Sequence, residues 1–329
     1  LIVGFFIIIR INHANILHIL YIFASIISHL NFIMKRSVQF ALDISILFCS
    51  SAGFLISILV LVVIIRHRQQ HPITSAILLL CNTHVSIMFT CINFVIMYAY
   101  SLHGDLYKNV DFNDWWCYLH SYIVHVGLCS IYQSFLLQSC FRFFRVVFHR
   151  NRQLQNMKFI FGSILCQWIL SFLFMMIIFL LQYIVYLPDY YHCQVSFSNF
   201  FGLFLTIAMI YFGPTTISTV LYMYLMYYLK HNQVNTRNSN KRDLMVLRRI
   251  IILILSILFL SLPTLILWLF YIITGQLYYL SYHLEWFLFS LSLSILSVAS
   301  AVLSPHFSRL LQMYLVLDRR VHPMGTNTI

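Results

Sequence analysis

Apolar residues gather in seven long stretches of this chain, and none of these stretches contains an acidic residue, Lys or Arg. A helix needs about 20 apolar residues to cross the hydrocarbon core of a bilayer. Backbone polar groups cannot stay unpaired in lipid, so each stretch is expected to be a helix. The stretches are Ile44–Ile65, Ile73–Ala99, Trp115–Cys140, Phe159–Leu187, Val195–Leu229, Ile250–Thr274 and Trp286–Ser308. The pattern predicts an all-α membrane protein built as a seven-helix bundle.

The predicted bundle occupies most of the chain. It takes residues 44–314, between a segment at 1–43 and a short tail at 315–329. Composition agrees with this division, because only 9% of residues are charged and 61% are hydrophobic, whereas soluble domains are about 25% charged. The connecting loops are short, so no separate soluble domain is expected.

Basic residues alternate between loops and predict an orientation. Sixteen of the 20 Lys and Arg residues follow odd-numbered stretches, while the loops after even-numbered stretches hold five acids and a single Lys. Short loops rich in Lys and Arg stay in the cytoplasm, where anionic lipid also favours them. The segment before the first stretch is therefore expected outside and the tail in the cytoplasm. The net charge of +12 then needs no nucleic-acid partner.

The predicted membrane topology distinguishes two of the eight cysteines from the others. Cys117 and Cys193 lie near or beyond the expected outer membrane boundary, whereas the other six fall inside apolar stretches. The outside of a cell is oxidising, so these two are expected to form a disulfide. The bond would tie the start of the third helix to the loop between the fourth and fifth.

Residues 1–33 leave three interpretations open. The segment is apolar but interrupted by Arg10 and several Asn and His residues, and Met34 is the first methionine. It fits an upstream stretch that was translated by mistake in front of a start at Met34, a poor signal sequence or signal anchor, or an interfacial helix. No functional role is assigned to it.

Several residues stand in an order, and some of them at spacings, that are characteristic of a known family of membrane proteins. Arg142 follows Cys117 by 25 residues and Tyr222 follows Pro214 by eight. The series also includes Trp168 in the fourth stretch, Asp243 and Pro263 around the sixth, and Pro305 in the seventh. In this series the chain resembles the rhodopsin-like class of G-protein-coupled receptors, over about Ile44–Tyr314. The resemblance implies a plasma-membrane receptor.

The chain also departs from that class. The second stretch has no aspartate, Gly53 stands where the first helix of the class carries asparagine, and Ser261 replaces an aromatic residue near Pro263. The motif around Arg142 has lost its acid, and Phe143 replaces the tyrosine. The buried sodium site of the class is therefore not expected, which leaves coupling to a G protein as an open question.

The resemblance implies a switch at the cytoplasmic ends of the helices. Arg142 and Asp243 would form an ion pair between the third and sixth helices, and Tyr222 would turn inward when the bundle opens. Prolines remove helix hydrogen bonds, so Pro263 and Pro305, like Pro214, would allow helix ends to swing. The alternative is that the two charges only face the membrane interface.

An opened bundle would admit a helix of the G protein by its apolar face. The expected contacts are Arg145 and Val146 below the third helix and Arg248 and Arg249 below the sixth. These basic residues are equally compatible with contacts to lipid head groups.

The ligand class is only partly indicated. Amine receptors of the class carry an aspartate where this chain has Val124, and no Lys occurs in Trp286–Ser308 to hold retinal. Acids outnumber Lys on the expected outer side, which favours a short cationic neuropeptide. The expected pocket residues are Val124, His125, Trp268 and Tyr271, although aromatic belts and helix packing also use such residues.

No enzyme, metal or cofactor motif occurs in the sequence. The protein is therefore expected to be no enzyme and to bind neither metal nor cofactor. Three alternatives to a receptor remain: a transporter or channel, a seven-helix chemoreceptor channel of opposite orientation, and a non-signalling membrane scaffold. Transporters and channels usually contain repeats, broken helices and charges inside the membrane, and charges are expected to be absent from these helices.

Overall fold

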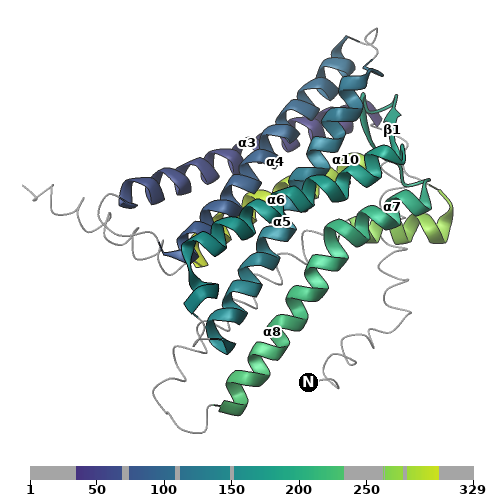
Figure 1. Cartoon of the computed structure of the whole chain (residues 1–329). Helices are drawn as coiled ribbons and strands as arrows, with labels where there is room; N and C mark the ends of the chain where they lie inside the picture. The colour runs from purple at the N-terminus through teal and green to yellow at the C-terminus, as the bar shows by residue number, and fades with distance from the viewer. Residues whose placement is uncertain are drawn as a thin grey trace, which may run out of the picture.

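The computed structural model describes residues 35–68, 74–107, 112–148, 152–232, 262, 264–276 and 280–303. Figure 1 gives the arrangement of the elements and their labels. The long helices are α3 (Lys35–Arg68), α4 (Ser75–Leu106), α5 (Trp115–Val147), α6 (Met157–Leu180), α8 (Gly213–Asn232) and α10 (Ser281–Leu303). The shorter elements are the 3₁₀ turn η1 (Arg152–Gln155), α7 (Phe200–Ile207), the π-helical turn η2 (Ala208–Phe212), and strands β1 (Ile184–Leu187) and β2 (His192–Val195).

Six helical segments in this part of the chain are long and apolar enough to cross a membrane. They match six of the seven predicted stretches, with α7, η2 and α8 forming one continuous span. A shorter apolar helix, Thr264–Thr274, covers the end of the expected sixth stretch, whose remaining residues, apart from Leu262, lie outside the described ones. The protein is thus a mostly helical, multi-pass membrane protein.

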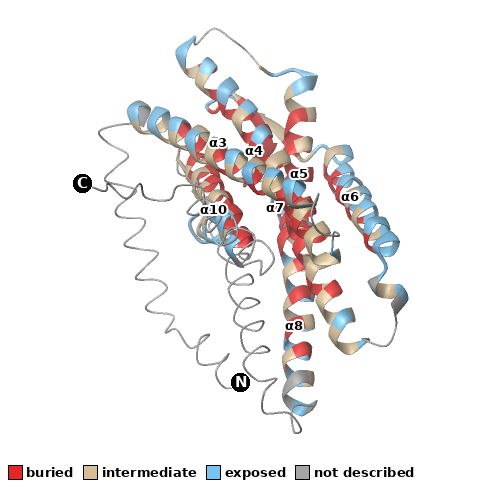
Figure 2. Ribbon diagram, turned by 90° about the vertical axis from the view of Figure 1, so that its left-hand side faces the viewer, coloured by how far each residue is buried: buried red, intermediate tan, exposed pale blue. Residues whose placement is uncertain are grey.

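Helix α5 is the central helix of the bundle. It packs against α4, α6 and α8. In its most apolar 18-residue segment 67% of the residues are buried, against 22% for α6 and 28% for α3. In Figure 2 the outward side of α6 is largely exposed, while buried residues concentrate along α5. Exposed residues on the outer helices are large and apolar, such as Phe161 and Leu180. Such surfaces suit lipid, because water would not favour so many contiguous apolar side chains.

The span formed by α7 and α8 is interrupted next to Pro214. Pro214 has no backbone N–H to donate to the preceding turn, and the helix widens into η2 at Ala208–Phe212 just before it. The N–H of Gly213 bonds the carbonyl of Ala208, and the hydroxyl of Thr215 bonds the carbonyl of Phe212 at 3.2 Å. The proline therefore produces a π turn, a local feature that often accompanies functional sites.

A short hairpin covers one end of the bundle. Strands β1 and β2 are antiparallel, with Ile184 opposite Val195, and the whole of β2 is buried against α4 and α5. Cys193 of β2 is bonded to Cys117 at the start of α5, so the predicted disulfide is confirmed. We call this end of the bundle the disulfide end, and the end that carries Arg142 the arginine end.

Several helix boundaries differ from the predicted ones. Residues Ile184–Leu187 and Val195, expected at the end of the fourth helix and the start of the fifth, belong to strands β1 and β2. Two other differences bury acidic residues inside helices. Helix α3 starts at Lys35 rather than near Ile44, and α10 starts at Ser281 rather than at Trp286. Asp43 is therefore inside α3 and fully buried, and Glu285 is a buried residue of α10 rather than part of an outer loop. The expectation that charges are absent from the spans is wrong at these positions, because each carboxyl group has a polar partner that the apolar pattern does not reveal.

Candidate functional site

A buried aspartate–histidine contact joins two helices at the disulfide end. Nε2 of His283 in α10 lies 3.1 Å from Oδ1 of Asp43 in α3, and the two side chains are 2% and 0% exposed. The hydroxyl of Ser101 in α4 lies 3.0 Å from Oδ2 of Asp43 and 3.1 Å from the carbonyl oxygen of Tyr190, both of which are acceptors. One polar cluster thus connects α3, α4, α10 and the hairpin turn. We call these residues the Asp43 cluster.

The hairpin is held to α10 by a second set of hydrogen bonds. The indole N–H of Trp286 donates to Oε1 of Gln194, an oxygen that also lies 3.2 Å from Nε2 of His192. Nδ1 of His192 lies 2.9 Å from the carbonyl oxygen of Tyr190. The hydroxyl of Tyr282 accepts from the N–H of Phe197 at 3.1 Å. Hairpin and helix therefore form one rigid polar unit beneath the disulfide.

His192 is a neutral member of this unit. Burial lowers the pKa of its imidazole from 6.5 to about 4 and outweighs the opposing hydrogen bond to the carbonyl of Tyr190. His283 lowers this pKa further, while Gln194 and the Asp43 carboxylate raise it. A proton on His192 therefore favours the unfolded chain, in which the imidazole is solvated.

The stability of the folded protein is expected to depend on pH through His192. Above pH 6.5 the imidazole is neutral in both the folded and the unfolded chain, so it does not lower the free energy of unfolding. As pH falls from 6.5 toward 4, only the unfolded chain takes up the proton, and the free energy of unfolding falls by about 1.4 kcal/mol for each unit of pKa difference. Melting temperatures of detergent-purified protein between pH 4 and 7 should fall less steeply for His192→Phe than for wild type. The exposed His103 gives a matched control, since His103→Phe should keep the wild-type slope. Identical slopes for wild type and His192→Phe would contradict the assignment.

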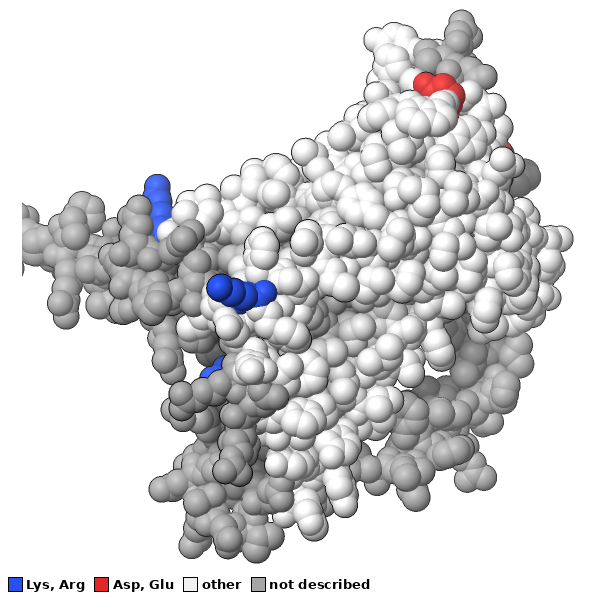
Figure 3. Space-filling model, viewed as in Figure 1, with Lys and Arg blue, Asp and Glu red and all other residues white. Residues whose placement is uncertain are grey.

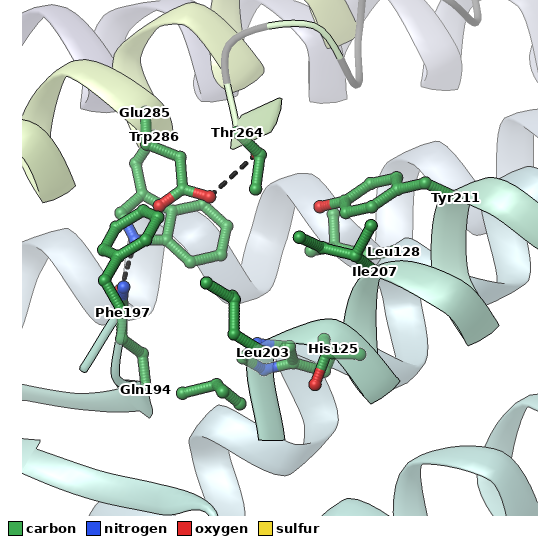
Figure 4. Close-up of a pocket in the computed structure, with 12 residues that line it drawn as sticks. His125, Leu128, Gln194, Phe197, Leu203, Ile207, Tyr211, Thr264, Glu285 and Trp286 are labelled. Atoms are coloured by element: carbon green, nitrogen blue, oxygen red, sulfur yellow. Dashed lines mark hydrogen bonds between the residues drawn. The ribbon is translucent and has the colours of Figure 1, made fainter. Parts of the chain in front are cut away.

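A small polar cavity lies under the hairpin, as Figure 4 shows. Its volume is about 20 Å³, which is enough for a water molecule and too small for a peptide side chain. The carboxylate of Glu285 accepts from the hydroxyl of Thr264 at 2.8 Å at its edge. The other lining residues with polar side-chain atoms are His125, Gln194, Thr206, Tyr211 and Trp286. Residues with a carboxyl group, an imidazole and an amide therefore line the same small cavity.

The expected pocket residues are only partly brought together. His125 lines the small cavity, and Val124 is fully buried beside it in α5. Trp268 and Tyr271 pack against the core from the Thr264–Thr274 helix without lining that cavity. Sequence reasoning missed Glu285 and Gln194, which lie in or beside segments that look like loops. Glu285 directly precedes the apolar run at Trp286, and this adjacency was the one available signal.

The arginine end brings two of the expected switch residues together. Nη1 of Arg142 in α5 lies 3.4 Å from the hydroxyl of Tyr222 in α8. Val146 and Val147 pack against Tyr222 and its neighbour Leu225. Arg145 is exposed. The other expected residues of this end, Asp243, Arg248, Arg249, Pro263 and Pro305, lie outside the described residues.

Charge is divided between the two ends. Figure 3 shows Lys and Arg at one end of the visible face and acidic residues at the other. Arg66 and Lys158 are exposed beside the arginine end, while Asp114 and Asp189 are exposed at the disulfide end. Across the described ranges no group of three or more His, Cys, Asp or Glu side chains is placed to hold a metal ion.

Comparison with known proteins adds no family to this picture. No protein-family model matches the sequence, and no curated protein matches it.

Proposed function

We propose that the chain is a rhodopsin-like G-protein-coupled receptor of the plasma membrane, with seven helices, the disulfide end outside and the arginine end in the cytoplasm. The observation that carries this proposal is the position of α5. At one end α5 is bonded to the hairpin through Cys117 and lines the small cavity with His125. At the other end it contacts Tyr222 through Arg142. One buried helix thus links a candidate ligand site to a candidate G-protein site.

The switch in this proposal is the exchange of partners by Arg142. Arg142 would pair with Asp243 in one state and contact the hydroxyl of Tyr222 in the other. A partly exposed ion pair contributes about 0–1 kcal/mol, which biases a two-state equilibrium without locking it. Opening would allow a helix of the G protein to contact Val146, Arg248, Arg249 and the already exposed Arg145.

A short cationic peptide is the ligand class that the charges favour. Asp114 and Asp189 place exposed acids at the disulfide end, and the carboxyl group of Glu285 lies at the small cavity of the same end. Opposite charges around a cleft raise the association rate of a charged ligand. The small cavity would have to widen on binding, and the Thr264–Thr274 helix that contributes Thr264 is the element expected to move.

A transporter is the second candidate, and the Asp43 cluster is the observation that favours it. Ionisable side chains buried in membrane helices are costly and commonly mark ion or substrate pathways. Here Asp43 and His283 pair with each other at one end, rather than lining a path through the bundle. The receptor therefore accounts for more of the described residues.

A signalling assay in cells that express the full chain tests the proposal. A library of short basic peptides should yield at least one that evokes a calcium or cyclic-nucleotide response. Arg142→Gln should reduce that response about tenfold or more, because the variant keeps a polar side chain but loses the charge that selects between partners. Arg66→Gln, which removes an exposed charge at the same end, should leave the response unchanged.

The transporter predicts a different result in the same cells. Uptake or current would then depend on Asp43 and His283, and Arg142→Gln would have no more effect than Arg66→Gln. A protein that reaches the plasma membrane but gives no G-protein-dependent response to any peptide in the library would count against the receptor.

A further inference from the structure

A second, larger cavity lies between the ends of α4 and α5 and the turn of the hairpin. Its volume is about 210 Å³. A cavity of about 150 Å³ takes up benzene, so this one can hold a group the size of a substituted ring. It shares no lining residue with the small cavity beneath the hairpin. It is therefore a separate site, and its assignment does not depend on the receptor function proposed above.

The walls of this cavity are largely aromatic. Tyr100 of α4 and Phe112 pack edge to face, with ring centroids 5.4 Å apart. Tyr191 of the hairpin turn and Trp116 of α5 complete the lining rings. The Tyr191 ring lies so close to Gly104 that a Cβ atom there would overlap it, so the hairpin turn is seated directly on α4. Faces of aromatic rings attract cations, so four lining rings give this cavity the composition of a site for ammonium groups.

A carboxylate stands at the cavity with a fixed position. Asp114 caps α5, and its Oδ1 accepts from the N–H of Cys117 at 2.9 Å. The side chain is exposed and also lines the cavity. A negative charge beside an aromatic cage strengthens the selection for a cation over a neutral molecule of the same shape.

His120 provides the independent sign that the cavity receives a ligand. Its side chain is only 7% exposed and lines the cavity, and its ring stacks on Trp116 with centroids 6.2 Å apart. Its Nε2 is buried and has no hydrogen-bond partner within the described part of the chain. A buried polar atom without a partner is costly in a folded protein. Among such side-chain atoms in the described residues, this nitrogen is the one whose residue lines the larger cavity. An aromatic belt at the membrane interface explains Trp116 and Tyr100 but not this unpaired nitrogen.

We propose that this cavity binds a small organic cation of the ammonium class. The rings of Tyr100, Phe112, Trp116 and Tyr191 surround the charged group, and the Asp114 carboxylate neutralises it. Nε2 of His120 accepts a hydrogen bond from an N–H of a primary or secondary ammonium. A free amine in its protonated form and the head group of a choline lipid share this chemistry.

Binding to the purified full-length chain tests the proposal, with phenethylammonium as the probe and 2-phenylethanol as its neutral counterpart. Ligand-observed NMR or calorimetry in uncharged maltoside micelles should show saturable binding of the ammonium compound and about tenfold weaker binding of the alcohol. Tetramethylammonium, which has no N–H, should bind to the same site.

Three variants separate the contributions of the site. Asp114→Asn keeps a residue that caps helices equally well but removes the charge, and it should weaken binding of both cations about tenfold. Asp189→Asn removes an exposed acid at the same end, outside the larger cavity, and should leave the affinity of that cavity for both cations unchanged. His120→Phe keeps a ring against Trp116, and it should weaken phenethylammonium while leaving tetramethylammonium unaffected.

Repeating the titration in phosphatidylcholine nanodiscs distinguishes the two sources of the cation. Equal affinity in micelles and nanodiscs identifies a soluble amine as the occupant. Affinity lost in nanodiscs and kept in micelles identifies the choline head group, which then competes with the probe. The proposal is overturned if the probe fails to bind in micelles, if the alcohol binds as well, or if Asp114→Asn binds as wild type does.

Discussion

Replacing His283 by leucine is expected to lower the free energy of unfolding by about 3–5 kcal/mol, because the change leaves a buried charge without its partner. Asp43 is fully buried and would keep only the hydrogen bond from Ser101. The two residues belong to α3 and α10, which lie far apart in sequence and pack side by side. The loss should therefore loosen the contact between these two helices rather than a local turn.

A double-mutant cycle gives the sharpest measurement of this pair. Asp43→Leu alone should also be strongly destabilising, since it leaves His283 buried beside an apolar group. The double variant Asp43→Leu with His283→Leu should be less destabilised than the sum of the single changes, because buried ion pairs are often replaceable by apolar residues. Melting temperatures in detergent would show this coupling.

The exposed His103 gives the control for this cycle. His103→Leu should shift the melting temperature little, since surface changes usually stay within about 0.5 kcal/mol. Strictly additive effects of Asp43→Leu and His283→Leu would mean that the two side chains do not interact, and the Asp43 cluster would lose its structural role.

The Asp43 cluster also illustrates what the sequence could not provide. Membrane-spanning helices follow from apolar content alone, because lipid imposes the same requirement on every residue of a span. Whether a charge can enter a span depends on a partner from another helix, and this partner is set by packing. Asp43 is 240 residues away from His283 in the chain, and no local pattern connects them. A boundary drawn at the first charge therefore placed Asp43 and Glu285 outside the helices.

The candidate sites were likewise only partly predictable from the sequence. The Cys117–Cys193 bond was predictable, because only these two cysteines fall where the solvent is oxidising. The hairpin that carries Cys193 was not predicted, since strands of four residues within a loop have little pattern of their own. Both cavities are made by side chains from several elements, so His125 was the only expected pocket residue that lines either of them.

Removing the disulfide is expected to destabilise the protein by about 2–5 kcal/mol. The bond closes a loop of 76 residues, and the chain-entropy model gives larger stabilisation for longer loops. Membrane insertion already restricts the unfolded chain, so a value near the lower bound is expected. The double variant Cys117→Ser with Cys193→Ser should therefore melt well below the wild type.

The consequence of this change should extend beyond stability. Cys117 and Cys193 both line the larger cavity, and Gln194 and Val195 of the same strand line the small one. Without the bond, hydrogen bonds such as those from Trp286 and Ser101, together with the packing of β2 and Tyr191 on the helices, hold the hairpin in place. Ligand responses should weaken even at temperatures where the helices remain folded, because the roof of both cavities becomes mobile.

Reduction of the wild-type protein provides the matched comparison. A reducing agent should lower the melting temperature of wild type and of Cys166→Ser, whose altered cysteine is free and exposed. It should have no effect on the double variant, which has lost the bond already. An equal melting temperature for wild type with and without reductant would show that the hairpin is held mainly by its polar contacts with α10. The Asp43 cluster and Trp286, rather than the sulfur bridge, would then determine the shape of both cavities.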